Sequence, residues 1–310
     1  MTIIYPSVRP SLSWKHLQLS DDLGRVEGVV DEATIRAHAF AIGDDPERYL
    51  EGIGDSGPFV PPSLVANDLL KIFMVGYDCT PPWEGGFHAR SQVDYLAKIP
   101  LGASITITGT HIAKFRKRGR VYRSIQSEAR LADGTTAVRL IATESMGYVV
   151  TQEPDEGAPP ADWTQGWPRI GAELAQDDAR AVGSQTHLIG MAESAIFSGY
   201  PFSWAYDSPQ WIRAGLHTDP AIAAKAGFPA PVVQGQLSAS HLTSIFLDLY
   251  GAKAAESVSL SLVFISSTLV GDRLTSRAVP IGGLREEPTF SLLSSRQNGE
   301  VVAAGYGMVR

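Results

Sequence analysis

The sequence predicts an α+β fold made of two similar halves, each with one long helix and several antiparallel strands. The first observation is the length of 310 residues, about twice that of a typical single domain. The second is residues 151–168, a stretch rich in proline, glycine and acidic side chains that is typical of a linker. The third is the order of the elements, which is the same on both sides of that stretch. We therefore predict an N-terminal domain over residues 1–150, a linker over 151–168 and a C-terminal domain over 169–310.

One long helix is predicted in each half, over residues 61–77 and 229–251. Both stretches open with closely spaced prolines and continue with apolar residues at helical spacing. Proline favours a helix start because its fixed φ and its missing N–H are tolerated there. The second stretch ends at Gly251, which suits a helix C-cap.

Strand patterns follow each predicted helix. Residues 91–112 and 258–281 each contain an apolar segment, a turn and a second segment in which apolar and polar residues alternate. Each half also contains a hairpin signal, Asp-Gly at 133–134 and Asn-Gly at 298–299. Because the two signals fall at equivalent places, a repeated architecture is favoured over an ordinary α+β protein whose halves look alike by chance.

Composition narrows the function classes. Hydrophobic residues make up 44% of the chain and charged residues 19%, as in soluble proteins with sizeable cores. The net charge of -7 is spread without long runs, which argues against a nucleic-acid partner. One basic cluster, residues 114–120, fits a solvated strand end better than an anion-binding patch. Cys79 is the only cysteine, so we expect a packed structural thiol and no intrachain disulfide.

Neither a membrane segment nor a cofactor is expected. Residues 1–20 are too short and too discontinuously apolar for a signal peptide or a membrane span, so we expect a soluble cytoplasmic protein. The histidines are scattered, and no phosphate-cradling glycine loop follows a strand. The sequence therefore predicts no metal site and no nucleotide redox cofactor.

Residues 216–237, LHTDPAIAAKAGFPAPVVQGQL, carry an ordered set of motif residues. They resemble the signature of the MaoC-like, (R)-specific enoyl-CoA hydratase family, in which Asn-Pro-Ile-His-x-Asp is followed by Ala-x-x-x-Gly-Phe and Pro-Val-Val-His-Gly. The residues that match in order are His217, Asp219, Ala224, Gly227, Phe228, Pro231, Val232, Val233 and Gly235.

The first half resembles the amino-terminal domain of double-hotdog members of that family. The similar segments are residues 38–50, 60–64, 87–102 and 116–122. Together the resemblances imply a double hotdog, in which two fused domains each wrap an antiparallel sheet around a long central helix. They also imply binding of an acyl thioester, carried by CoA or by an acyl carrier protein.

The chain departs from the family pattern at the catalytic positions. Family hydratases use an aspartate and a histidine in an Asp-x-Asn-Pro-x-His loop to position water. His217 is retained, but Tyr200 stands at the aspartate position and an insertion follows it. Gln234 stands where the helix-start histidine is expected. The resemblance therefore implies an incomplete catalytic pair.

Three residues are candidates for the chemistry. Hydration of an unsaturated thioester needs a base, an acid and donors for the enolate oxygen. His217 is the candidate proton carrier, with a structural histidine as the alternative. Asp207 could replace the missing aspartate if the inserted loop folds back, or could be an exposed loop carboxylate. Tyr200 could donate a hydrogen bond to an oxyanion or form an aromatic wall.

Four further residues are candidates for substrate binding. Gly235 would let a thioester carbonyl approach the N-terminus of the second helix, or would only relieve crowding there. Gln234 can orient a substrate or water but cannot exchange protons. Trp204 and Trp211 lie in the aromatic insertion, which reads as a lid or wall for a bulky or ring-bearing acyl group, or as a packed loop.

Two other residues have narrower expectations. Asp219 is expected to cap the helix that follows it through its carboxylate. His88 lies ahead of the first long strand, where it could approach the pocket or remain at the strand edge.

Three functions remain open from the sequence. The first is a hydro-lyase that hydrates an enoyl thioester or dehydrates a 3-hydroxyacyl thioester. The second is an isomerase or cyclase on the same scaffold, for which altered catalytic positions would be natural. The third is a non-catalytic hotdog partner subunit. A homodimer is compatible with all three.

Overall fold

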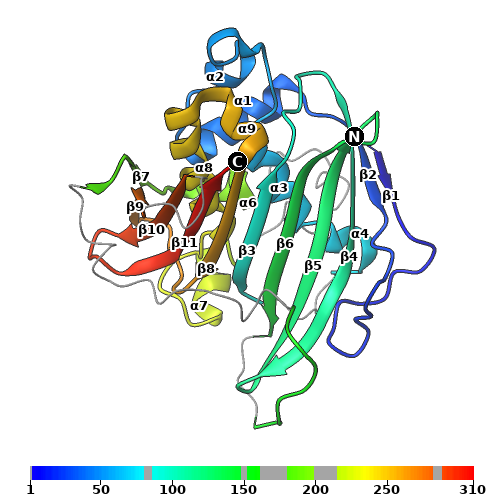
Figure 1. Cartoon of the computed structure of the whole chain (residues 1–310). Helices are drawn as coiled ribbons and strands as arrows, with labels where there is room; N and C mark the ends of the chain where they lie inside the picture. Colours follow the sequence, from blue (N-terminus) through cyan, green and yellow to red (C-terminus); the bar gives the residue numbers. More distant parts are fainter. Residues whose placement is uncertain (1, 80–85, 148–151, 161–179, 199–214, 282–287) are drawn as a thin grey trace.

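A single antiparallel sheet runs through the whole molecule (Figure 1). The computed structural model describes residues 2–79, 86–147, 152–160, 180–198, 215–281 and 288–310. In these residues the strand order is β1-β2-β4-β5-β6-β3-β8-β11-β10-β9-β7. The N-terminal half supplies one side of the sheet and the C-terminal half supplies the other, and the two sides meet where β3 pairs with β8.

The N-terminal half contains the strands β1 to β6 and the first helices. Its strands are β1 (Thr2–Ile4), β2 (Arg25–Val29), β3 (His88–Tyr95), β4 (Ser104–Lys117), β5 (Arg120–Leu131) and β6 (Thr136–Met146). Its helices are α1 (Glu32–Ile42), α2 (Glu47–Leu50), α3 (Pro62–Leu70) and α4 (Phe73–Gly76), with a 3₁₀ turn at Gly54–Ser56.

The C-terminal half contains the strands β7 to β11. They are β7 (Gly183–Leu188), β8 (Val258–Phe264), β9 (Arg273–Pro280), β10 (Thr289–Arg296) and β11 (Val301–Val309). The helices are α6 (Met191–Ser198), α7 (Pro220–Lys225), α8 (Gly235–Tyr250) and α9 (Ala254–Ser257), with a 3₁₀ turn at Gly251–Lys253.

The helix predicted over residues 61–77 is present but broken. It forms α3, with Pro62 at the favoured first position, and the short α4. Between them the backbone switches to hydrogen bonds of the i to i+3 type, from Lys71 N–H to Asp68 O and from Met74 N–H to Lys71 O. The break matters because the side chains around it line a cavity described below.

The second predicted helix is continuous. Helix α8 begins at Gly235, after the prolines rather than with them, and Gly251 is its C-cap as expected. The central helices lie against different parts of the sheet, with α3 contacting β4, β5 and β6 and α8 contacting β3, β7, β8 and β9. The two helices also contact each other.

Both predicted hairpins are confirmed. The β5–β6 hairpin turns at Gly134 and the β10–β11 hairpin turns at Gly299, each glycine with a positive φ that other residues adopt only with strain. The turns fall at equivalent positions in the two halves, so this part of the repeat holds in three dimensions.

The two halves are tied together by polar contacts as well as by the β3–β8 ladder. The Tyr95 hydroxyl and the Thr243 hydroxyl are 2.9 Å apart, and the Ser244 hydroxyl donates to Asp44 at 2.9 Å. One hydrophobic cluster also extends across both halves. The proposed domain boundaries stay a prediction, because sheet and core are continuous and only residues 152–160 of the linker belong to the described structure.

The environment of Cys79 and the length of the helices bear on two further expectations from the sequence. Cys79 is buried, and burial raises the pKa of its thiol to about 12, which fits the packed structural role. Among the described helices, none is both long and apolar enough to cross a membrane.

Candidate active site

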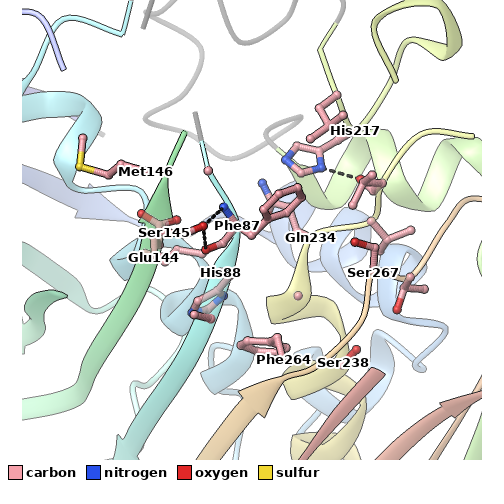
Figure 2. Close-up of a pocket in the computed structure, with 18 of the residues that line it drawn as sticks. Phe87, His88, Glu144, Ser145, Met146, His217, Gln234, Ser238, Phe264 and Ser267 are labelled. Atoms are coloured by element: carbon pink, nitrogen blue, oxygen red, sulfur yellow. Dashed lines mark hydrogen bonds between the residues drawn. The ribbon is translucent and has the colours of Figure 1, made fainter. Parts of the chain in front are cut away.

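A cavity of about 490 Å³ lies between the two halves (Figure 2). This volume lies within the range of small-molecule sites. The cavity lining includes residues of both halves: Lys71, Phe73, His88, Arg123 and Glu144 from the N-terminal half and His217, Val232, Gln234, Gly235 and Phe264 from the C-terminal half.

His217 is held at this cavity by its local backbone. It precedes α7, whose first turn is capped by Asp219, as the sequence predicts, through bonds to the Ala221 and Ile222 N–H groups. The Ser194 hydroxyl donates to the His217 carbonyl at 2.9 Å.

The imidazole of His217 is fixed in one tautomer. Its Nδ1 lies 2.5 Å from the Val232 carbonyl oxygen, the contact drawn in Figure 2. A carbonyl can only accept, so Nδ1 carries the proton and Nε2 of the neutral ring carries the lone pair. Nε2 makes no hydrogen bond to the residues that the structure describes.

The surroundings of His217 favour its neutral form. The side chain keeps partial access through the cavity although protein surrounds it. Burial lowers the pKa of His217, the hydrogen bond to Val232 opposes that shift, and the positive charge of Lys71 adds to it. A neutral imidazole with a lone pair on Nε2 can accept a proton near pH 7.

Gln234 and Gly235 form the start of α8 beside His217. Gln234 is the N-cap residue of α8, but its side chain does not cap the helix. Its Nε2 donates instead to the Ser198 carbonyl at 3.3 Å. A Cβ on Gly235 would lie 3.0 Å from the ring of Phe264. Relief of crowding therefore explains the glycine, while approach of a thioester carbonyl stays a proposal.

Lys71 is a site residue that sequence reasoning missed. It is the C-cap residue of α3, it is 3% exposed, and its Nζ donates to the Phe197 carbonyl at 3.5 Å. Asn67 donates to the same carbonyl at 3.0 Å. Burial lowers the pKa of Lys71 to about 7, against the opposing charge of Asp68. The available signal was a lysine directly after the apolar run of a central helix.

A row of polar side chains crosses the N-terminal wall of the cavity. His88 stacks on Phe264 with ring centroids 4.4 Å apart, and burial lowers the pKa of His88 to about 4, so its ring is neutral. Glu144 is cross-strand partner to both His88 and Arg123. Of the two expectations for His88, approach to the pocket is the one the structure bears out.

Four predicted site residues lie outside the described residues. They are Tyr200, Trp204, Asp207 and Trp211, and their roles stay predictions. Within the described ranges, no three His, Cys, Asp or Glu side chains are grouped as a metal would require.

Known proteins resemble this chain in sequence and in structure. A family model described as MaoC like domain matches residues 214–287. The (R)-specific enoyl-CoA hydratase of Aeromonas caviae is 33% identical over 98 residues, which are 31% of this chain and 72% of that protein.

Two solved structures share the fold over almost the whole chain. A MaoC-like dehydratase from Phytophthora capsici aligns with a TM-score of 0.65 and 17% identity, over 92% of this chain and 94% of its own. A Mycobacterium tuberculosis protein described as a double hotdog aligns with a TM-score of 0.61 and 10% identity, over 96% of this chain and 98% of its own. The predicted double-hotdog fold is therefore confirmed.

Proposed function

The chain belongs to the MaoC-like family of hydratases and dehydratases, and from this premise we propose that it is a hydro-lyase acting on an acyl-CoA. The reaction would be hydration of a 2-enoyl thioester or its reverse, dehydration of a 3-hydroxyacyl thioester. The observation that carries the proposal is the neutral imidazole of His217, with Nε2 available at the cavity beside the start of α8.

His217 would act as the base in the hydration direction. Its Nε2 takes a proton from water while the water oxygen forms a bond to C3 of the enoyl group. The π electrons move towards the thioester, whose oxygen gains negative charge. The first N–H groups of α8 have no partners within the helix, and the helix dipole favours negative charge there. They are suited to stabilise that oxygen.

A second group must deliver a proton to C2. Gln234 cannot do this, because an amide does not exchange protons at neutral pH. The ammonium of Lys71 lines the same cavity, and its pKa of about 7 suits proton transfer. We assign the acid role to Lys71. The proton taken by His217 then returns to Lys71 through solvent, which closes the cycle.

The proposal also covers the kind of acyl group and the carrier to which it is attached. The aromatic insertion with Trp204 and Trp211 supports a bulky or ring-bearing acyl group. Asp207 and Tyr200 stay candidates for orienting water or the oxyanion. CoA is favoured as carrier by the family relationship, and an acyl carrier protein is the alternative.

Gln234 at the helix start gives a second candidate function some support. An isomerase on the same scaffold would need one proton carrier and no activated water. Reaction in heavy-oxygen water separates the two, because a hydratase product gains the label and an isomerase product keeps its mass.

The test of the main proposal is turnover of a panel of 2-enoyl-CoA and 3-hydroxyacyl-CoA thioesters of different chain lengths. We expect conversion by the native chain and a fall in kcat of about a hundredfold or more for His217→Gln. His16→Gln is the control, because His16 is exposed and lies outside the cavity. A native chain inert on the whole panel, or a fully active His217→Gln, would overturn the proposal.

A further inference from the structure

The N-terminal wall of the cavity contains a buried guanidinium that the proposed chemistry does not use. Arg123 lies on β5, lines the cavity, and has a side chain only 4% exposed. One of its terminal nitrogens donates to Glu144 at 2.6 Å, and the guanidinium carbon lies 3.8 Å from the ring centroid of Phe73. These contacts hold the group in place but use only part of its donor capacity.

The remaining donors of Arg123 are what point to a ligand. Nε and the other terminal nitrogen, Nη1, are buried and make no hydrogen bond within the described part of the chain. Buried N–H groups are almost always paired in native proteins, because an unpaired one loses its water without replacement. An acceptor that enters the cavity would satisfy them.

The charge balance of the Arg123–Glu144 pair favours a neutral acceptor. Glu144 already neutralises the guanidinium, and a second carboxylate beside Arg123 would be repelled by Glu144. The neighbouring His88 is neutral and adds no positive charge. A carbonyl or hydroxyl oxygen satisfies the free N–H groups without this repulsion.

The position of Arg123 places that oxygen away from the reacting carbons. Phe264 marks the start of α8, since its ring lies against Gly235. In the sheet, β8 with Phe264 is followed by β3 with His88, β6 with Glu144 and β5 with Arg123. Figure 2 shows Glu144 beside His88. Three strand intervals correspond to roughly 14 Å. The oxygen therefore belongs to the distal part of the ligand.

We propose that Arg123 binds a carbonyl or hydroxyl oxygen on the distal acyl chain, so that the site prefers oxygenated acyl thioesters to plain alkyl ones. The inference rests on the proposed function for the thioester itself. An amide oxygen of the pantetheine arm offers the same chemistry, and the experiment separates the two sources because every probe carries the same CoA.

Binding of inert CoA thioethers tests the proposal without turnover. The probes are S-(2-oxoalkyl)-CoA compounds of equal chain length, with a plain tail, a distal keto group or a terminal carboxylate. Calorimetry on the native chain should give the keto probe an affinity about tenfold above the plain one. Arg123→Lys keeps the positive charge opposite Glu144 but loses the two unpaired donor positions. It should abolish the tenfold difference between the keto and plain probes, while the affinity for the plain probe stays within about twofold of the native value.

Two variants sharpen the result. Glu144→Gln removes the balancing charge, so the carboxylate probe should bind more tightly than to the native chain. Arg130→Met is the matched control, because Arg130 lies on the same strand but is exposed and outside the cavity, and it should change nothing.

Equal affinity of keto and plain probes for the native chain would overturn the inference alone. An equal loss for all probes in Arg123→Lys would assign the contact to the CoA arm and overturn the acyl assignment. If no probe binds the native chain, both the thioester proposal and this inference fail.

Discussion

His217 and Lys71 show how burial sets the charge of a side chain. For both, the loss of water disfavours the charged form and lowers the pKa, and the positive charge of Lys71 lowers the pKa of His217 further. The result is a neutral imidazole and an amine near its titration midpoint at neutral pH. The neutral imidazole is already the main form of histidine at pH 7 in water, whereas an amine near its midpoint at that pH is far from the ordinary state of lysine. In the proposed mechanism these two side chains of one cavity are the proton acceptor and the proton donor.

Replacing Lys71 separates proton transfer from simple charge. Lys71→Met should lower kcat by about a hundredfold, because it removes the acid. Lys71→Arg should be nearly as inactive, since a guanidinium keeps the charge but does not release a proton at neutral pH. Steady-state kinetics on the best enoyl-CoA, with thioether binding as a check of folding, make the measurement.

A structural or purely electrostatic role for Lys71 predicts a different pattern. Lys71→Arg would then retain most of the activity. Lys98→Met is the control, because Lys98 also donates to a backbone carbonyl, that of Ser56, but lies outside the cavity.

Sequence could place some of these residues and not others. His217, Gln234 and Gly235 fall within one local motif, and the structure places them around one cavity. Lys71 and Arg123 reach that cavity only because β3 pairs with β8 and joins the halves. No local spacing encodes such a long-range pairing, so the sequence does not show that these two residues reach the cavity.

The two central helices differ at the element scale although their sequence patterns are alike. Both stretches show apolar residues at helical spacing, yet α8 is continuous and the first helix breaks after Leu70. Helical periodicity reports which face of a helix is buried, while the point where the helix ends also depends on tertiary packing, which overrides local propensity. The double-hotdog plan was predictable, and the break was not.

The start of α8 can be tested through its contact with β8. Gly235→Ala places a methyl group 3.0 Å from the Phe264 ring, tighter than nine in ten real contacts of this kind, so the ring must give way by a few tenths of an ångström. We expect a loss of about 1–3 kcal/mol in unfolding free energy and a fall in activity. The measurement is urea denaturation of the variant beside the native chain.

A second substitution shows whether crowding is the cause. Gly235→Ala combined with Phe264→Leu should recover part of the lost stability relative to Phe264→Leu alone. If the two losses simply add, the contact between the glycine and the ring is not what requires glycine at this position.

At the scale of the whole molecule, buried histidines make stability depend on pH. Burial lowers the pKa of His38 to about 3 and that of His88 to about 4, and it also lowers the pKa of His187 and His241. In the unfolded chain each histidine takes up a proton near pH 6.5. The unfolded state therefore binds more protons than the native state below that pH, and stability falls as the pH falls.

The size of this effect can be measured between pH 6.5 and pH 5, where the histidines of the unfolded chain take up most of their protons. Each pH unit is worth up to about 1.4 kcal/mol per displaced histidine, and an unfolded histidine is only half protonated at pH 6.5. His38 and His88 together should therefore cost about 3 kcal/mol between pH 6.5 and 5. Buried carboxylates such as Asp21 and Asp44 have lowered pKa values and lose their stabilising charge only at more acidic pH.

His88→Phe isolates one share of that loss. The ring nitrogens of His88 have no hydrogen-bond partners among the described residues and its ring stacks on Phe264, so phenylalanine should fit at little cost. Urea unfolding at pH 6.5 and pH 5 should show a pH-dependent loss about 2 kcal/mol smaller in His88→Phe than in the native chain. An unchanged loss would mean that His88 takes up its proton in the folded protein, through water that reaches the cavity wall.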